Sequence, residues 1–155
     1  MRMSETLAVT THRVFQAQMN EHDSLFGGTT LAWLDESASI AAHRFAKRQL
    51  VTGSVDEMVY VAPVLLGHAL MYSSVVSGVG KKSLEVFTKM VGEDLDSGKR
   101  YLAGYAFSTF VSQTDAPLAE LVADYPEGEQ LVAGYAKRRA ANKLRRQEMP
   151  EVGLD

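Results

Sequence analysis

The sequence predicts an α+β domain in which an antiparallel sheet packs over one long helix. Three observations lead to this class: one long helical pattern in the first third of the chain, four consecutive strand patterns after it, and short turns between those strands. A length of 155 residues suits a single domain. We therefore expect one domain over residues 1–126 and a helical tail over residues 127–155 that packs on or near it.

The first third of the chain contains a strand, a loop and the long helix. Residues 7–19 mix β-branched and polar side chains, which predicts a strand, and residues 20–28 are loop-like up to a glycine pair. From Thr29 onward, apolar residues recur at spacings of three and four over about 18 residues, which predicts a helix. Its apolar stripe consists of Leu31, Leu34, Ala38, Ala41 and Phe45.

Four strands and a second helix follow. The strand patterns cover residues 49–63, 68–79, 83–93 and 99–113, with turn residues between them. In the third pattern Leu84, Val86, Thr88 and Met90 share one face, with Glu85 and Lys89 on the other. The fourth is apolar on both faces, which indicates a central or doubly covered strand. Residues 127–148 predict a basic helix, since residues 137–146 hold six basic side chains and no acidic one.

Composition excludes several classes of protein. The sequence has no run of about 18 apolar residues, so we expect no membrane span. The first 15 residues lack the apolar core of a signal peptide, which predicts a cytoplasmic protein. The absence of cysteine excludes thiol catalysis and thiolate metal sites. Three of the four histidines, His12, His43 and His68, lack the spacing of metal ligands. A net charge of −3 does not favour binding of nucleic acid.

The segment between Asn20 and Asp35 carries the candidate chemistry. The backbone amides around Gly27, Gly28 and Thr29 lie where a helix starts and where no Cβ blocks a ligand, so they are candidate donors to a developing negative charge. The alternative is a glycine-assisted helix start. Asp35 falls on or beside the apolar stripe, where an unpartnered carboxylate is unfavourable. It is either a helix-edge residue paired with a cation, or a general base or nucleophile.

The spacing of these groups predicts a dimer. Gly28 and Asp35 are seven residues apart, which is about 10 Å along one helix. One substrate carbonyl cannot lie about 3 Å from both groups of the same helix. If both act on one carbonyl, they come from different copies of the chain.

These residues resemble the acyl-CoA hydrolases of the hotdog-fold thioesterase superfamily. The pattern of asparagine, six residues, Gly-Gly and a helix bearing Trp-Leu-Asp is similar to that family's motif. Further similarities follow in order along residues 10–146: Ala-Ala-His-Arg at 41–44, Val-Thr at 51–52, Val-Asp at 55–56, Pro-Val at 63–64 with Gly67, Lys-Ser-Leu-Glu-Val at 82–86, and residues 106–111. Many members have glycine where this chain has Asp23.

The resemblance implies a five-stranded antiparallel sheet wrapped round a central helix, in dimers that often form trimers of dimers. It implies hydrolysis of acyl-CoA, with Asp35 as general base or nucleophile, Asn20 of the other subunit orienting water or substrate, and the Gly28 amide, with Gly27 nearby, polarising the thioester carbonyl. The implied CoA-binding residues are Gly53, Ser54, Val55, Lys82, Ser83, Leu84 and one of Arg138 and Arg139. Coenzyme A enters only as part of substrate and product, and no metal or redox cofactor is implied.

Two alternatives remain within the fold family. A hotdog dehydratase would use a loop histidine with a helix carboxylate, here His22 with Asp35. A non-catalytic module that binds acyl-CoA would need neither Asp35 nor Asn20. For the basic helix, a solvated face near an oligomer contact, CoA phosphate binding and nucleic-acid binding are the three interpretations, and the last is weak because no aromatic side chains interleave the charges.

Overall fold

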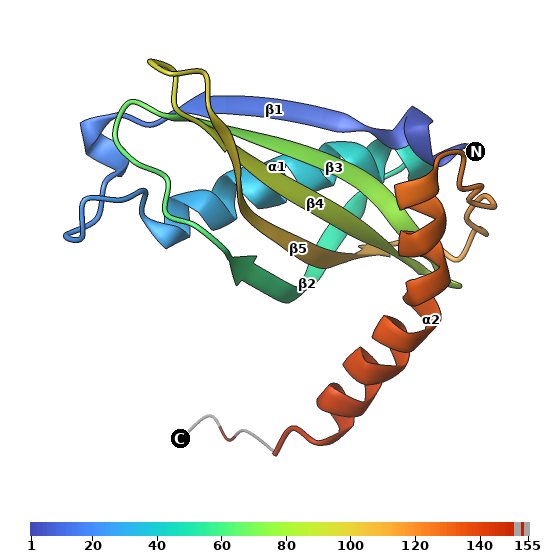
Figure 1. Cartoon of the computed structure of the whole chain (residues 1–155). Coiled ribbons are helices and arrows are strands. Elements are labelled where there is room, and N and C mark those ends of the chain that lie inside the picture. Colours follow the sequence, from blue (N-terminus) through green and yellow to red (C-terminus); the bar gives the residue numbers. More distant parts are fainter. Residues whose placement is uncertain (151–152, 154–155) are drawn as a thin grey trace.

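The computed structural model describes residues 1–150 and 153 and has one five-stranded sheet with two helices (Figure 1). The strands lie in the order β1-β3-β4-β5-β2, and each neighbouring pair is antiparallel. The elements are β1 (Ala8–Arg13), α1 (Gly27–Ala46), β2 (Leu50–Tyr60), β3 (Ala69–Val79), β4 (Ser83–Glu93), β5 (Arg100–Ser112) and α2 (Pro126–Gln147), with 3-10 turns at Met3–Thr6 and Gln16–Gln18. This is the predicted α+β hotdog arrangement.

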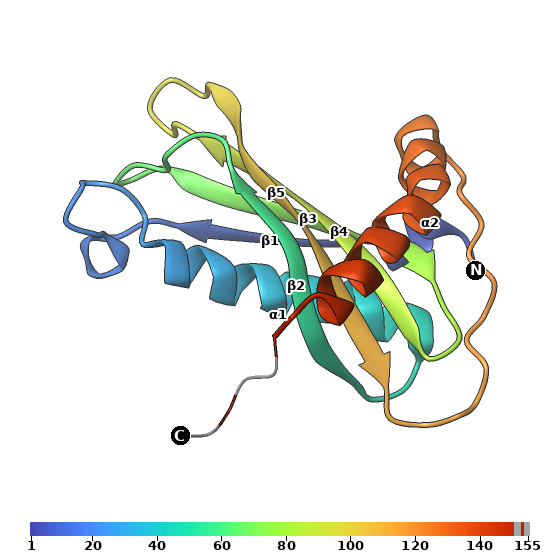
Figure 2. The same ribbon diagram turned by 90° about the horizontal axis from the view of Figure 1, so that it is seen from below.

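The core lies between α1 and one face of the sheet, along which the helix runs (Figure 2). Leu34 packs in a cluster at one end of the helix, and Phe45 packs in a second cluster at the other. The first cluster includes Val14, Leu70, Tyr72 and Met90, and the second includes Ala38, Ala41, Ala42, Val76, Leu84, Val86 and Phe110. Burial of these side chains fixes α1, and hence the groups that it carries, against the sheet.

Helix α1 begins two residues earlier than predicted, because the glycine pair is its first turn rather than the end of the loop. Phe26, in extended conformation, is the N-cap, and Lys47 ends the helix with a left-handed φ of 54°. The predicted apolar stripe is buried from Leu34 to Phe45. Leu31 is different: it is 39% exposed, so its predicted place in the core of this chain was wrong.

The first strand is shorter than predicted. It ends at Arg13, and Val14 then exchanges backbone hydrogen bonds with the turn before β3, donating to His68 O and accepting from Gly67 N, each at 2.9 Å. A 3-10 turn at Gln16–Gln18 follows. Strand structure predicted for residues 14–19 was therefore wrong.

Strand β2 contains two irregularities, at Gly53 and Asp56. Thr52 pairs with Phe110 and Ser54 pairs with Thr109, so residues two apart on β2 face adjacent residues on β5. Such an extra residue is a β-bulge, and it reverses the alternation of the strand. Thr52 consequently faces α1, whereas Ser54 faces the opposite side of the sheet.

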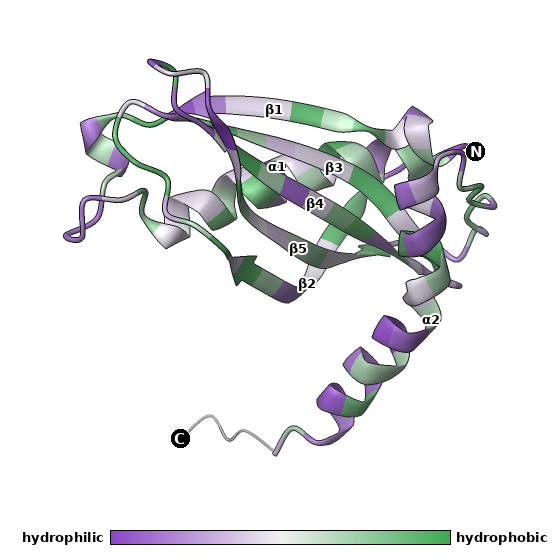
Figure 3. Ribbon diagram, in the orientation of Figure 1, coloured by the Kyte–Doolittle hydropathy of each residue, from purple (hydrophilic) through white to green (hydrophobic). Residues whose placement is uncertain are grey.

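Helix α2 crosses that opposite side (Figures 1 and 2). The ring of Tyr135 lies directly on Gly78 of β3, where a Cβ would come within 2.1 Å of a ring carbon. Glu85 lies on the face away from the α1 core, as the alternation predicts, but α2 covers it there and leaves it only 2% exposed. Hydrophilic residues dominate the later turns of α2 (Figure 3). No helix in the described part of the chain is long and apolar enough to cross a membrane.

Candidate active site

The first turn of α1 presents backbone amides that the helix itself does not use. Thr30 N donates to Phe26 O at 3.1 Å, which is where α-helical bonding starts. The amides of Gly27 and Gly28 precede it and have no carbonyl within the helix to bind. The Phe26 ring lies against Gly28, and a Cβ on that residue would be 2.5 Å from the ring carbon Cε1. The absence of a side chain at Gly28 therefore leaves room for the Phe26 ring in this position.

Tyr60, the last residue of β2, is bound to the same turn. Its hydroxyl donates to the carbonyl oxygen of Gly27 at 3.0 Å. Desolvation raises the pKa of the Tyr60 hydroxyl above its usual value, so the group stays protonated and remains a donor. The sequence pattern did not single out Tyr60, because an aromatic residue at a strand end is common and the contact joins positions 33 residues apart.

Asn20 organises the loop that precedes α1. Its Oδ1 accepts hydrogen bonds from the backbone amides of His22 at 2.9 Å and Ser24 at 3.1 Å, and its Nδ2 donates to Ser24 Oγ at 3.1 Å. Within this turn Asp23 has a φ of 57°, in the left-handed region that favours glycine. Aspartate tolerates that region better than most residues do, which accounts for Asp23 where many family members have glycine.

A cavity of about 400 Å³ opens between this loop, the start of α1 and the sheet. Asn20, Gly27, Thr30 and Tyr60 contribute the polar part of its lining. The remaining walls are mostly apolar and include Leu25, Val64, Leu70, Met90 and Ala103. Such a lining suits an apolar chain whose polar end lies beside the helix start.

Asp35 lies two turns further along α1 and is half-buried. Its Oδ1 accepts a hydrogen bond of 2.9 Å from Thr52 Oγ1, across from the helix on β2. In the described part of the chain, the contact that Asp35 makes is thus with a hydroxyl, not with the arginine or lysine of a helix-edge ion pair. The sequence pattern does not reveal Thr52 as a partner, because the bulge at Gly53 determines which face of β2 Thr52 occupies.

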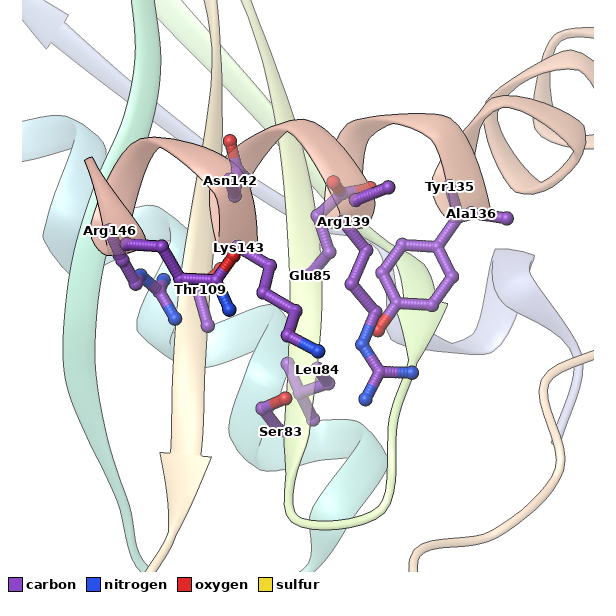
Figure 4. A pocket seen from close by; sticks show the side chains of 12 residues that line it. Ser83, Leu84, Glu85, Thr109, Tyr135, Ala136, Arg139, Asn142, Lys143 and Arg146 are labelled. Carbon is purple, nitrogen blue, oxygen red and sulfur yellow. The ribbon is translucent and has the colours of Figure 1, made fainter.

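A second concavity, of about 710 Å³, lies between α2 and the ends of β4 and β5 (Figure 4). Arg139, Lys143 and Arg146 extend from one side of α2 over it. Ser83 and Leu84 of β4 and Thr109 of β5 form the opposite wall. We call this concavity the basic cleft. Arg139 and Lys143 beside hydroxyl groups favour binding of an anion such as a phosphate, whereas Arg146 already lies 3.5 Å from the Asp56 carboxylate.

The two arginines proposed for CoA have different surroundings. Arg138 binds the carboxylate of Glu85, with Nη2–Oε1 at 2.8 Å and Nε–Oε2 at 3.0 Å, and its guanidinium lies 4.3 Å from the centre of the Phe107 ring. It also donates to Leu131 O at 2.6 Å. Arg139 is exposed and lines the basic cleft. The geometry therefore favours Arg139 for contact with a ligand.

The predicted CoA residues on β2 and in the β3–β4 turn have different surroundings. Ser54 donates to Asp56 Oδ1 at 2.7 Å and accepts from Arg146 Nη2 at 3.1 Å. Gly53 is the bulge residue, Val55 is half-buried, and Lys82 forms an ion pair with Asp115.

The Asp56 carboxylate, two residues after Ser54 on β2, is buried. Its side chain is 6% exposed, because Ser54, Thr109 and Arg146 surround the carboxylate.

The histidine of the dehydratase alternative lies in the exposed loop. The side chain of His22 is 78% exposed, and its Nε2 lies 3.4 Å from the carboxylate of Glu21. Among the described residues, no hydrogen bond or ion pair joins His22 to Asp35, the carboxylate that a dehydratase would pair with it. Nor do residues 1–150 and 153 contain a cluster of three His, Asp or Glu side chains that could hold a metal ion.

The chain is similar to a known protein family and to curated proteins. The family model described as "Thioesterase superfamily" matches residues 22–99, which is half of the chain. An uncharacterized acyl-CoA thioester hydrolase of Bacillus subtilis is 40% identical over 108 residues, which are 70% of this chain and 63% of that protein. The chain spans less than two thirds of the length of the curated relatives that it matches most strongly.

Solved structures match nearly the whole chain. The acyl-CoA hydrolase of Staphylococcus aureus, studied in complex with butyryl coenzyme A, coenzyme A and coenzyme A disulfide, has a TM-score of 0.89 and 31% identity over 96% of this chain and 93% of that one. Variants of that protein with an aspartate, a threonine or an asparagine replaced by alanine have also been studied. A hexameric acyl-CoA thioesterase has a TM-score of 0.92 and 25% identity over 96% of this chain and 98% of that one.

Proposed function

The chain belongs to the thioesterase superfamily, and we propose that it is an acyl-CoA hydrolase, which cleaves an acyl-CoA thioester into a free carboxylic acid and coenzyme A. The observation that carries the proposal is the trio of Asn20, Asp35 and Thr52. The three residues replaced by alanine in the Staphylococcus aureus hydrolase are spaced by 15 and 17 residues, in the order asparagine, aspartate, threonine. Asn20, Asp35 and Thr52 have the same order and the same two spacings.

The reaction assigns a role to each group. Asp35 acts as general base or as nucleophile on the thioester carbonyl. In the first case it takes a proton from water, whose oxygen attacks the carbonyl carbon. The resulting oxyanion accepts a hydrogen bond from the Gly28 amide, and the C–S bond then breaks as the thiolate of CoA leaves and is protonated. In the second case a carboxylate oxygen of Asp35 attacks the carbonyl carbon, and the C–S bond breaks to release the CoA thiolate, which takes a proton from solvent. Water then hydrolyses the mixed anhydride to the free acid and the Asp35 carboxylate.

The active site is proposed to form between two copies of the chain. Gly28 and Asp35 are both on α1 and are about 10 Å apart along its axis, too far for one carbonyl to contact both. Asn20 and Gly28 of one subunit would therefore meet Asp35 of its partner. Exposed apolar side chains on the first turns of α1 and on the segment that follows β2 favour association, because burying apolar area between chains is favourable. They are Phe26, Leu31, Val61, Leu65 and Leu66.

The two concavities match the two ends of the substrate. The apolar cavity beside Asn20 and Gly27 would take the acyl chain. The basic cleft would take the phosphates of CoA through Arg139, with Lys143 and Arg146 on the same side of α2. Trimers of such dimers are proposed as well, since one solved relative is hexameric.

The decisive experiment measures release of free CoA from acyl-CoA esters of increasing chain length. Asp35→Asn is expected to lower kcat by about a hundredfold or more, as for loss of a general base or nucleophile. Glu36→Gln is the matched control, because Glu36 is the next residue of the same helix and is exposed. Ordinary turnover by Asp35→Asn, or an equal loss in Glu36→Gln, would refute the role of Asp35.

Two further measurements resolve the mechanism. Label found in the Asp35 carboxylate after a single turnover in ¹⁸O-labelled water identifies Asp35 as the nucleophile, with water attacking its Cγ in the mixed anhydride, whereas a general base leaves label only in the product acid. Inactive Asn20→Ala and Asp35→Ala chains, mixed and refolded together, are expected to regain part of their activity. Demonstrated mixed dimers without activity would rule out the shared site.

A further inference from the structure

The hydrogen bond between Tyr60 and Gly27 has a chemical meaning beyond anchoring β2 to α1. The carbonyl of Gly27 and the amide N–H of Gly28 belong to one planar peptide unit. The Tyr60 hydroxyl donates to the oxygen of this unit at 3.0 Å. The nitrogen of the same unit is the proposed oxyanion donor. One side chain thus holds the far end of the group that would contact the substrate.

Such a contact changes both the orientation and the strength of the donor. Because the peptide is planar, fixing its oxygen fixes the direction of its N–H. A hydrogen bond to the carbonyl also withdraws electron density from the nitrogen, and linked hydrogen bonds strengthen one another. Gly27 and Gly28 have no side chains that would restrain this turn by packing. The Tyr60 hydroxyl therefore adds a restraint from outside the helix to the bond that Leu31 N–H makes with the same Gly27 oxygen within α1.

A second tyrosine makes the same bond at a position where it cannot have this effect. Tyr72 of β3 is fully buried, and its hydroxyl donates to Thr30 O at 3.0 Å. The N–H in that peptide unit belongs to Leu31, which the α-helical pattern pairs with the carbonyl of Gly27. Its N–H is thus used inside the helix and does not face a ligand. The two tyrosines bind the same helical turn, but only Tyr60 acts on a free amide.

We propose that Tyr60 is a positioning residue for thioester hydrolysis, which orients and polarises the Gly27–Gly28 peptide so that its N–H stabilises the oxyanion. The inference rests on the proposed function, since it deepens the role of the Gly28 amide. Tyr60 also lines the cavity proposed for the acyl chain, and the aromatic ring contributes to that wall independently of the hydroxyl.

The test removes each hydroxyl separately and keeps both rings. Tyr60→Phe is expected to lower kcat about three- to tenfold, the effect of losing one hydrogen bond, with KM for acyl-CoA changed by less than about twofold. Tyr72→Phe is the matched control and is expected to keep kcat while lowering the melting temperature. In ¹H–¹⁵N spectra of the full-length protein, the Gly28 amide proton should move upfield in Tyr60→Phe and stay in place in Tyr72→Phe. Comparison with a Gly28→Ala spectrum identifies that resonance.

Each outcome separates the two proposals. Wild-type protein that hydrolyses no thioester refutes the proposed function, and the role of Tyr60 falls with it. Active wild-type protein with unchanged kcat in Tyr60→Phe refutes the role of Tyr60 alone. An equal loss of kcat in both variants, or an unmoved Gly28 amide resonance in Tyr60→Phe, would assign Tyr60 a merely structural role and overturn the inference.

Discussion

Arg138 of α2 and Glu85 of β4 form a two-pronged ion pair beneath α2, with N–O distances of 2.8 and 3.0 Å. The Glu85 side chain is 3% exposed, and Ser77 Oγ donates to its Oε1 at 2.7 Å. Arg138 in turn lies over the Phe107 ring. This pair joins α2 to β4 through two residues that are 53 positions apart in the chain. It positions the face of α2 that carries Arg139 over the basic cleft.

We predict that Arg138→Ala destabilises the protein by about 3–5 kcal/mol, because it leaves the buried Glu85 carboxylate without its cation. Arg139→Ala removes the same charge from an exposed neighbouring position and should change the free energy of unfolding by less than about 0.5 kcal/mol. Urea unfolding followed by circular dichroism measures both. Equal losses in the two variants would contradict the structural assignment of Arg138.

Substrate binding should depend on Arg139 rather than on its neighbours. Arg139→Ala is expected to raise KM for acyl-CoA and to leave KM unchanged for short thioesters that lack the nucleotide. The reason is that the basic cleft is proposed to contact only the phosphate-bearing end of acyl-CoA. Lys137→Ala is the control, since Lys137 lies on another side of α2, next to Asp56 and Glu57. Steady-state kinetics with the two substrate types provide the comparison. A rise of KM for both substrates would show that the cleft is not the nucleotide site.

The Asp35–Thr52 contact predicts a hydroxyl-dependent effect on turnover. Thr52→Val keeps the shape of the side chain but removes the hydrogen bond to Asp35 Oδ1, so kcat should fall by about tenfold or more, the effect of losing a hydrogen bond to a charged group. Thr52→Ser should restore most of that loss because the hydroxyl returns. If valine and serine behave alike, the hydroxyl has no role in the reaction.

The N-terminal segment should contribute stability that depends on pH. Hydrogen bonds from the Ser4 side chain and backbone hold the pKa of the Asp124 carboxyl below its ordinary value. A carboxyl with a lowered pKa in the folded state stabilises the fold above its unfolded pKa of about 4, and this contribution disappears as the pH falls through the folded pKa. Asp124→Asn should therefore lower Tm at pH 7, and its difference from wild type should shrink below about pH 4. Thermal unfolding across pH 2–7 tests this, and Ser4→Ala should show the same trend.

The local spacing of apolar residues was sufficient to predict those helices and strands that bury one face or both faces. The strand predicted over residues 83–93 has the same bounds in the structure, since the alternation of Leu84, Val86, Thr88 and Met90 matches a sheet face buried under α1. The helix was found for the same reason, except at its start. There the glycine pair is typical of a loop in sequence, although the backbone of Gly27 and Gly28 is helical and lies beside Phe26 and Tyr60.

Contacts between distant segments explain what the pattern did not reveal. Glu85 and Asp56 are buried only because α2 returns over the sheet with Arg138 and Arg146. Leu31 fits the helical stripe by spacing, yet its side chain is exposed on a single chain. The predicted pairing of Asn20 and Gly28 with Asp35 of another chain follows from distance along the helix alone, and it remains a prediction for the experiments above.

The bulge at Gly53 changes which face of the sheet the side chains of strand β2 point to. Because one extra residue is accommodated there, Thr52 is directed to Asp35 on the α1 side, and Ser54 is directed to Arg146 on the α2 side. A regular strand would place Thr52 and Ser54 on the same face, so that only one of them could make the contact it makes here. Deleting Gly53 would thus leave the composition of the strand almost unchanged. The side chains on one side of the deletion would, however, turn to the opposite face of the sheet. The number of residues in β2, as well as their chemistry, therefore determines which side chains reach Asp35 and which reach α2.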